Sequence, residues 1–379
     1  MLNELTEEQQ MIRDMVRDFA QKDIAPLADK YENEHAFPDV ILKKMGDLGL
    51  LGMGVPEEFG GCFSDHFSIF LAVEEISRVM PSLAVIFSVH CSLFCYALNH
   101  YGTPEQKAKY LPPAARGELL GAFSLTEPGA GSDATNLKTK AVRDRDDYII
   151  NGTKAWVTTG SAAGAIIVFA RTSEADRKKL SAFIVEESSP GYHVTKIEEK
   201  MGLHASQTAE ILLDNCRIPA SNLLGEEGKG AAIALNCLDG SRIGIAAQSV
   251  GLSQRALDEA LKYAQNREAF GKPIARLQAI QMKLADIATD LEAGRLLWHR
   301  AASLFDAGKP FTKEAAMAKL FASEAANRIV YEALQIHGGY GYSKEFKIEQ
   351  LYRDARVLSI YEGTSEIQRL VIARELLKQ

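Results

Sequence analysis

The 379-residue sequence lacks the short motifs that mark several common classes of enzyme. No G-x-G-x-x-G motif follows a predicted strand, which argues against a Rossmann nucleotide site. A Walker loop and a G-x-S-x-G elbow are absent too, so neither a P-loop NTPase nor an α/β-hydrolase is indicated. The sequence also has no excess of positive charge. Its formal net charge of −7 disfavours non-specific binding to nucleic acid or to anionic membranes.

Cysteines and long apolar runs are scarce as well. The five cysteines are scattered without the spacing of a disulfide framework, which is typical of free thiols in a reducing compartment. The apolar run Ala162–Ala170 is long enough for a buried strand and too short to cross a bilayer. The chain opens with acidic residues rather than with a basic segment followed by an apolar one. We therefore expect no signal peptide and a cytoplasmic location.

No metal site is expected from the histidines and cysteines. The strongest cluster consists of His90, Cys91 and Cys95, and its spacing fits no common zinc pattern. Its neighbours in the sequence are mostly apolar, and cysteine is among the most often buried residue types. These three residues are therefore interpreted as part of a core or as lining a cleft.

The hydrophobic period changes along the chain and divides it into three parts. Apolar residues recur at helical spacing in Met11–Ala20, after a capping-box pattern at Thr6 and Gln9. The middle of the chain has short apolar runs between turn signals such as Asn-Gly and Pro-Gly. Long helical patterns return after Gly228. We expect an α+β fold with an N-terminal α-helical domain (1–119), a middle antiparallel β-barrel or β-sandwich domain (120–228) and a C-terminal four-helix-bundle domain (229–379).

Two stretches of the middle domain have the composition of a ligand site. Phe123–Asp133 reads FSLTEPGAGSD, a strand running into a loop of small residues whose backbone N–H groups can face a ligand. A polar turn between strands is an equal alternative. On the next β segment, alternation points Trp156 and Thr158 to one face and Val157 to the other. An aromatic plane beside a hydroxyl group suits a flat, heteroatom-rich ring, although a core tryptophan is locally the commoner case.

Two stretches of the C-terminal domain end predicted helices. Arg267–Gly271 (REAFG) has an arginine that could bind a pyrophosphate in a forked geometry and a phenylalanine that could pack on a purine. Gln335–Gly341 (QIHGGYG) has glycines that allow a left-handed cap or close contact with a ligand. Ordinary helix termination explains either motif alone. Their occurrence together with the motifs of the middle domain, in this order, is the informative feature.

Together with IYEGTSEIQ at Ile360–Gln368, these stretches resemble the acyl-CoA dehydrogenase family of flavoproteins over essentially the whole chain. The segment TSEIQRLVIA is similar to the butyryl-type members, and LEAGRLLWHRAASLFDAGKPFTKEAAMAK is similar to the 2-methyl-branched type. The resemblance implies FAD, bound non-covalently between the β domain and the C-terminal helices. It also implies α,β-dehydrogenation of a short-chain or short/branched-chain acyl-CoA to the trans-2-enoyl-CoA.

The family pattern implies roles for individual residues. Glu362 falls on the usual catalytic base. Contacts with the acyl-CoA are implied for Ser132, Asp239, Arg242 and Gly363. Contacts with FAD are implied for Phe123, Leu125, Thr126, Gly131, Ser132, Trp156, Val157, Thr158, Arg267, Phe270, Gln278, Gln335, Gly338, Gly339, Thr364 and Glu366.

A carboxylate at Glu362 suits this reaction. Oxidising a saturated thioester to its 2,3-enoyl form removes a proton from C2 and a hydride from C3. The resemblance implies that the thioester carbonyl accepts bonds from the backbone N–H of Glu362 and from a ribityl hydroxyl of FAD. Because an exposed glutamate near pKa 4.3 would be a poor base, we expect enclosure to raise the pKa of Glu362. The helix around Arg242–Gln248 offers no replacement carboxylate.

The resemblance also implies partners. Electron-transfer flavoprotein is the family's electron acceptor, and the family is usually a homotetramer, a dimer of dimers, in which Arg267, Phe270 and Gln278 reach the flavin of a neighbouring subunit. Two alternatives share the fold: an acyl-CoA oxidase that returns electrons to O2, and a non-catalytic flavoprotein scaffold. The acidic composition and the presence of Glu362 argue against a scaffold. Acyl chain length and branching stay open.

Overall fold

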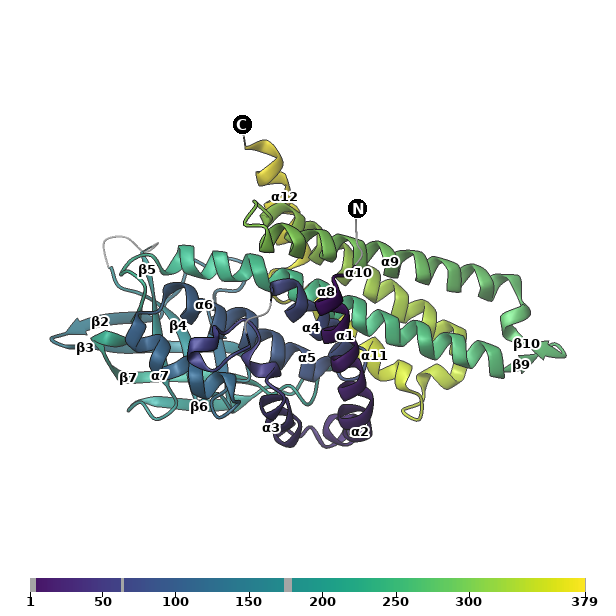
Figure 1. The fold of residues 1–379 in the computed structure, drawn as a ribbon, viewed down its shortest axis with the longest axis horizontal. Helices are drawn as coiled ribbons and strands as arrows, with labels where there is room; N and C mark the ends of the chain where they lie inside the picture. Colours follow the sequence, from purple (N-terminus) through teal and green to yellow (C-terminus); the bar gives the residue numbers. More distant parts are fainter. Residues whose placement is uncertain (1–4, 63–64, 174–178, 379) are drawn as a thin grey trace.

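The computed structural model describes residues 5–62, 65–173 and 179–378. The strands of the middle domain form a sheet at one end of an elongated molecule (Figure 1). Long C-terminal helices extend from this sheet to the other end. The N-terminal helices pack between the two. The predicted helical–β–helical order is confirmed.

The N-terminal part of the chain is helical. Thr6 and Gln9 form the predicted capping box, because each side chain accepts a hydrogen bond of 3.1 Å from the backbone N–H of the other. The helices are α1 (Glu7–Phe19), α2 (Ala25–Glu34), α3 (Asp39–Asp47), α4 (His66–Ser77), α5 (Pro81–Ser88), α6 (Tyr96–Tyr101) and α7 (Pro104–Ala115).

One segment of this domain is long and apolar enough to cross a membrane by length and composition. It runs from Pro81 to Tyr101 and contains a π-helical turn at Val89–Cys95 between α5 and α6. Of the most apolar 18-residue window of this segment, 94% is buried inside the fold. His90, Cys91 and Cys95 lie in the π-helical turn and are buried, as predicted for core residues.

The middle part forms an eight-stranded sheet in the order β6-β7-β3-β2-β4-β5-β8, with β1 paired to β4. Most pairs are antiparallel, as predicted, but β1 and β2 both pair with β4 in parallel. A long connection follows β1, which allows this arrangement because parallel strands need a crossover rather than a hairpin. The strands are β1 (Gly121–Ser124), β2 (Lys140–Asp144), β3 (Asp147–Thr158), β4 (Ala165–Arg171), β5 (Leu180–Glu186), β6 (Tyr192–Ile197), β7 (Thr208–Pro219) and β8 (Leu223–Leu224).

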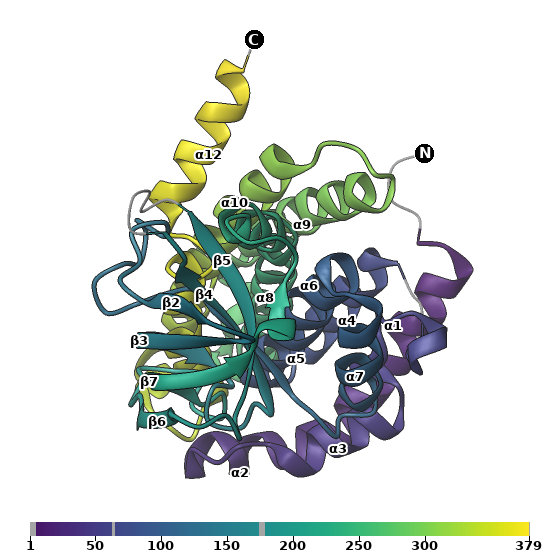
Figure 2. The ribbon, with the colours of Figure 1, turned by 90° about the vertical axis from the view of Figure 1, so that its left-hand side faces the viewer.

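The C-terminal part is a bundle of long helices. Glycines of α8 mark its closest contacts with the N-terminal helices, because a Cβ at Gly251 would lie 2.1 Å from the Glu74 carbonyl oxygen and one at Gly244 would lie 2.6 Å from Ser88 Oγ. The final helix projects away from the rest of the chain (Figures 1 and 2). The elements are α8 (Gly230–Asn266), the hairpin β9 (Glu268–Ala269) and β10 (Lys272–Pro273), α9 (Gln278–Asp306), α10 (Thr312–His337), α11 (Lys347–Ala355) and α12 (Ser365–Leu377).

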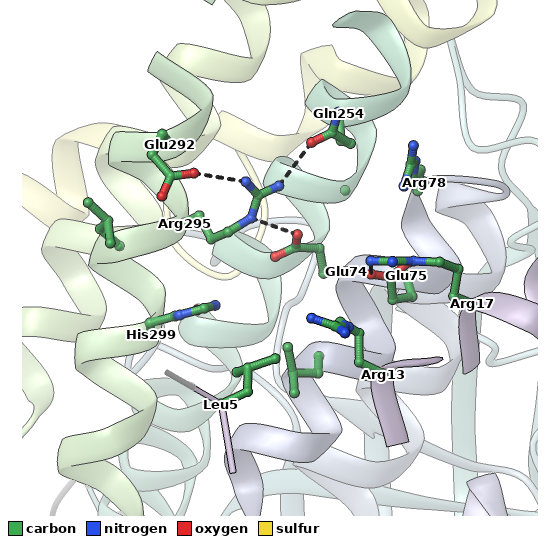
Figure 3. Close-up of a pocket in the computed structure, with 13 residues that line it drawn as sticks. Leu5, Arg13, Arg17, Glu74, Glu75, Arg78, Gln254, Glu292, Arg295 and His299 are labelled. Carbon is green, nitrogen blue, oxygen red and sulfur yellow. Dashed lines mark hydrogen bonds and ion pairs between the residues drawn. The ribbon is translucent and has the colours of Figure 1, made fainter. Parts of the chain in front are cut away.

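Ion pairs join the N-terminal helices to the bundle around a cavity of about 380 Å³ between α1, α4, α8 and α9 (Figure 3). Arg295 of α9 donates from Nε to Glu74 of α4 at 3.0 Å, and Arg78 donates from Nη2 to Asp258 of α8 at 2.6 Å. Within the N-terminal part, Arg17 donates from Nη2 to Glu75 at 2.6 Å. The indole N–H of Trp298 also donates to Glu74, at 2.9 Å. None of the predicted site residues lines this cavity, so we interpret these contacts as domain packing.

Candidate active site

Glu362 lies in a tight turn between a 3-10 turn at Arg356–Ser359 and α12. Its φ is 51° and that of Gly363 is 92°, so two successive residues have a left-handed backbone. For a non-glycine residue this conformation costs about 1–3 kcal/mol, and such residues cluster at functional sites. Gln368 Nε2 donates to the carbonyls of Glu362 and Gly363, at 3.1 and 3.0 Å, and Lys319 Nζ donates to the carbonyl of Gly363 at 2.7 Å. These bonds offset the strain of the turn.

The carboxylate of Glu362 is partly buried and faces α8. The hydroxyl of Ser241 donates to its Oε2 at 2.6 Å. Burial raises the pKa of Glu362 above the ordinary glutamate value, while the bond from Ser241 and the charges of Arg242 and Lys319 oppose the rise. The expectation of a raised pKa is confirmed. Glu362 is therefore not an ordinary solvated loop carboxylate.

The predicted acyl-CoA contacts Asp239 and Arg242 form an ion pair one turn apart on α8. Arg242 is 4% exposed, and its charge acts on Glu362. Asp239 is partly exposed and accepts a bond of 2.7 Å from the hydroxyl of Thr312. Of this pair, Asp239 is thus the residue within reach of a ligand from solvent. Gly363, the third predicted contact, is partly buried.

The start of α12 holds two more predicted residues. Thr364 is the N-cap of the helix, and its hydroxyl accepts from the N–H of Ile367 at 3.4 Å. Glu366 follows in the first turn and is exposed, so it complements the positive end of the helix dipole. Both residues lie next to the Glu362 turn, as their positions in the sequence require.

A buried ion pair ties the loop after β1 to β3. Glu127 accepts from Lys154 Nζ at 3.0 Å and from the backbone N–H groups of Lys138 and Thr139 at 2.6 and 3.0 Å. Lys154 also donates to the carbonyl of Leu125 at 3.1 Å, and both charged side chains are almost fully buried. The pair therefore fixes the shape of the loop that contains Leu125, Thr126, Gly131 and Ser132.

The end of β3 carries an exposed aromatic ring. The pairing with β7 shifts between Lys154 and Val157, and within this bulge Trp156 has φ 58°. Trp156 is 59% exposed, Val157 is buried and Thr158 is partly buried, which agrees with the predicted alternation. The alternative of a core tryptophan is thereby excluded.

The surroundings of this ring fit a flat ligand with polar edges. A Cβ at Gly131 would have no atom within 4 Å, so the loop backbone faces open space. The buried hydroxyls of Ser124 and Thr159 have no hydrogen-bond partner among the residues that the structure describes. Of the other predicted contacts on this side, Phe123, Leu125 and Thr126 are partly buried and Ser132 is exposed.

The remaining predicted flavin contacts form a second group at the far end of the bundle. The hairpin β9–β10, with Arg267 and Phe270 beside it, lies at the opposite end of the molecule from β3 (Figure 1). The Arg267 guanidinium lies 5.4 Å from the centre of the Tyr340 ring, which joins the hairpin to the end of α10. Phe270 is 89% exposed, with φ 55°. The other members of the group, Gln278, Gln335, Gly338 and Gly339, are exposed too.

Lys154→Met tests the pair that shapes the β1 loop. The substitution leaves Glu127 buried without its counter-charge, so we expect it to lower the free energy of unfolding by about 3–5 kcal/mol. The flavin should also dissociate more readily from the folded variant. Urea unfolding and the flavin content after gel filtration measure the two effects. Lys196→Met, at an exposed lysine of β6 paired with Glu198, is the control, and a loss below about 1 kcal/mol in Lys154→Met would contradict the assignment.

Sequence reasoning missed four residues of the site: Ser241, Lys319, Glu127 and Lys154. Lys319 gave a signal that could have been used, because it is a lone lysine among the alanines of AAMAKLFA. A helical period puts such a lysine on a buried face, where a charge needs a partner. Ser241 lay inside the stretch DGSR, which was assigned to CoA rather than to Glu362.

Comparisons with protein families agree with this geometry. Family models of the acyl-CoA dehydrogenase N-terminal, middle and C-terminal domains match residues 6–118, 122–216 and 228–377. The chain belongs to the acyl-CoA dehydrogenase family. It is accordingly an oxidoreductase that acts on CH–CH groups, and FAD is the family's cofactor. The open space at Gly131 and the exposed ring of Trp156 fit this cofactor.

Individual acyl-CoA dehydrogenases match along nearly their whole length. The mitochondrial short-chain specific acyl-CoA dehydrogenase of Mus musculus is 51% identical over 376 residues, which cover 99% of this chain and 91% of the mouse protein. Butyryl-CoA dehydrogenase from Megasphaera elsdenii is 42% identical, with a TM-score of 0.97 and 100% of both chains covered. A chain in a structure described as the electron transferring flavoprotein of Acidaminococcus fermentans is 45% identical, with a TM-score of 0.98 and 100% of both chains covered.

Proposed function

We propose that this acyl-CoA dehydrogenase oxidises a short-chain or short/branched-chain acyl-CoA to the trans-2-enoyl-CoA, with Glu362 as the catalytic base. The observation that carries the proposal is the Glu362 turn, in which a strained residue presents a partly buried carboxylate of raised pKa. The similar proteins support this substrate class, because one is a short-chain specific acyl-CoA dehydrogenase and another is a butyryl-CoA dehydrogenase.

Glu362 has the groups that the reaction needs. Its Oε2 accepts from Ser241, which leaves Oε1 to take the C2 proton of the thioester. Its backbone N–H has no acceptor within the part of the chain that the structure describes, so this N–H can donate to the thioester carbonyl. Such a bond polarises the carbonyl and makes the C2 proton more acidic. FAD, when bound, supplies the acceptor for the C3 hydride.

FAD would be held by two groups of residues that lie apart in one chain. The β1 loop and Trp156–Thr158 would hold the isoalloxazine ring and the adjoining atoms. The exposed group around Arg267 and Phe270, beside the hairpin at the opposite end of the molecule from β3, would hold the pyrophosphate and adenine of a neighbouring subunit's FAD (Figure 1). Two chains related by a twofold axis could exchange these groups reciprocally.

A homotetramer built as a dimer of dimers would bury further apolar surface. The projecting helix α12 carries Leu370, Leu376 and Leu377, each more than 60% exposed. Large apolar side chains gathered on a projecting helix are typical of a protein interface. Sedimentation velocity of the FAD-loaded protein tests the assembly, and a monomer would contradict it.

Contacts between α5 and α8 support a short acyl chain. Gln248 of α8 donates to the carbonyl of Pro81 at 2.9 Å and accepts from the hydroxyl of Tyr361, the neighbour of Glu362. The two helices also meet closely at Gly244 and Ser88. These contacts fill the space between the helices that lie beside the base, so a long acyl chain would have to displace them.

Gln248→Ala is expected to widen the range of acyl chains. Removing the side chain opens the contact between Pro81 and Tyr361, so the ratio of kcat/KM for octanoyl-CoA to that for butyryl-CoA should rise about tenfold or more, as expected for added apolar space. Gln254→Ala is the control, because Gln254 lies on the same helix but lines the separate cavity in Figure 3. An unchanged ratio would show that these contacts do not limit chain length.

Electron-transfer flavoprotein is the proposed electron acceptor. A similar chain in a structure described as an electron transferring flavoprotein supports this choice over O2. Turnover with butyryl-CoA should reduce electron-transfer flavoprotein under anaerobic conditions and release little peroxide in air. Stoichiometric O2 consumption with peroxide release would instead identify an acyl-CoA oxidase.

A further inference from the structure

Lys319 is a fully buried lysine of α10 that approaches the Glu362 turn from inside the bundle. Its ammonium donates to the Gly363 carbonyl at 2.7 Å, and the side chain is 0% exposed. Its buried neighbours on the same helix face are Ala315, Ala316, Ala322 and Ser323, and the hydroxyl of Ser323 donates to the Leu320 carbonyl at 3.4 Å, so none of them supplies a charge. Burying a cation in such surroundings is costly unless a nearby charge compensates it.

The compensating charge comes chiefly from Glu362. Burial lowers the pKa of Lys319 to about 7, and the carboxylate of Glu362 is the largest influence that opposes this shift. Conversely, Lys319 is one of two cations that oppose the raised pKa of Glu362. Three other charged groups act on the pair: Arg242 of α8 on both members, and Glu324 of α10 and Glu366 of α12 on Lys319. Around them, Glu362 raises the pKa of Cys237 and Tyr361, and Asp239 and Arg374 act on Arg242.

We propose that Lys319 is a positioning residue for proton abstraction, which fixes the turn that carries Glu362 and supplies positive charge behind its carboxylate. The inference rests on the proposed role of Glu362 as base. The hydrogen bond to Gly363 fixes the peptide plane that follows Glu362. The charge favours the ionised carboxylate, the form that can accept the C2 proton.

The geometry separates the two effects of Lys319. Gln368 donates to the same Gly363 carbonyl at 3.0 Å, so one bond to the turn survives when Lys319 is replaced. Among the described residues, Arg242 is the other cation that acts on Glu362, and it lies on α8 and is already paired with Asp239, so it does not replace the charge on the α10 side. Loss of Lys319 should therefore change the pH dependence of the reaction more than it changes the fold.

Rates of flavin reduction by butyryl-CoA, measured anaerobically across the pH range, test the proposal. In Lys319→Met the acid limb of the pH profile should shift to higher pH by about one pH unit, as expected for the loss of a nearby opposite charge. The rate should consequently fall near neutral pH and recover toward wild type at alkaline pH. Lys319→Arg, which keeps the charge, should restore most of the wild-type profile. Lys347→Met, a control at a largely buried lysine paired with Asp29, should leave the profile unchanged.

A second measurement does not depend on the folding of a Lys319 variant. In Glu362→Gln, Lys319 loses its main counter-charge, so its folded pKa should fall further below the unfolded value of about 10.4. Between those two pKa values the unfolded chain binds more protons than the folded chain, so the free energy of unfolding rises with pH. The thermal midpoint of FAD-loaded Glu362→Gln should therefore rise with pH relative to wild type below about pH 7, where the folded wild-type lysine is still protonated, and the two midpoints should change in parallel at higher pH.

The outcomes distinguish this inference from the proposed function. An unshifted acid limb in Lys319→Met, or a thermal midpoint of Glu362→Gln that follows wild type at every pH, would overturn the role of Lys319. In either case wild-type flavin reduction that is lost in Glu362→Gln would leave the base assignment intact. If wild type itself fails to reduce its flavin, the proposed function falls instead.

Discussion

Glu362→Gln is expected to slow flavin reduction by butyryl-CoA by about 10²- to 10⁴-fold, the usual contribution of a positioned general base. The amide is nearly the same size and can keep a hydrogen bond with Ser241, but it cannot accept the C2 proton. Substrate binding should change little, so the loss should appear in the limiting rate rather than in the concentration dependence. Stopped-flow absorbance of the oxidised flavin band measures both quantities.

The pH dependence of wild type follows from the same residue. Because the pKa of Glu362 is raised and the base must be ionised, the rate should increase with pH through a value above the ordinary glutamate pKa. Glu349→Gln, at a partly buried carboxylate bonded to Arg353, is the matched control and should keep the wild-type rate and profile. A Glu362→Gln rate within threefold of wild type would remove Glu362 from the mechanism.

Mixed oligomers of two inactive variants are expected to regain activity. Each flavin site is proposed to combine Glu362 and the sheet of one subunit with Arg267 of another. Glu362→Gln alone should be inactive for lack of a base, and Arg267→Glu alone should lose FAD because it repels the pyrophosphate. In a mixed pair, one of the two sites has both native residues, so activity should return to about half that of wild type.

Co-expression with two different affinity tags, followed by tandem purification, isolates the mixed oligomer for this test. The flavin content and the butyryl-CoA turnover per chain are the readouts. Mixing the separately purified variants without subunit exchange is the control and should give no activity. A mixed oligomer as inactive as its parents, with subunit mixing verified by mass spectrometry, would contradict the shared site.

The family and the fold class could be predicted from short motifs because those motifs lie in continuous stretches. The loop after Phe123, the exposed ring at Trp156 and the turn at Glu362 are each readable within about ten residues. The contacts that tune them are not local. Ser241 meets Glu362 across 121 positions of sequence, Lys319 meets Gly363 across 44, and Lys154 meets Glu127 across 27.

The backbone details of the site also could not be predicted from composition. The left-handed φ of Glu362 and of Trp156 belongs to residue types that rarely adopt it, so their side chains give no warning. The parallel pairing of β1 with β4 depends on where the chain returns after the loop. The alternation of apolar and polar residues along a strand is the same for parallel and antiparallel pairs, so it does not predict the direction. Both features arise from tertiary packing.

The central claim is tested most directly by mixing the FAD-loaded wild-type protein with butyryl-CoA under anaerobic conditions and following the oxidised flavin band. Parallel mixing with 2-methylbutyryl-CoA shows which short acyl group is preferred. We expect rapid bleaching with at least one of these thioesters and formation of the matching 2,3-enoyl-CoA. If neither these nor longer saturated acyl-CoA thioesters bleach the flavin, the proposed reaction is wrong and a non-catalytic flavoprotein becomes the better account.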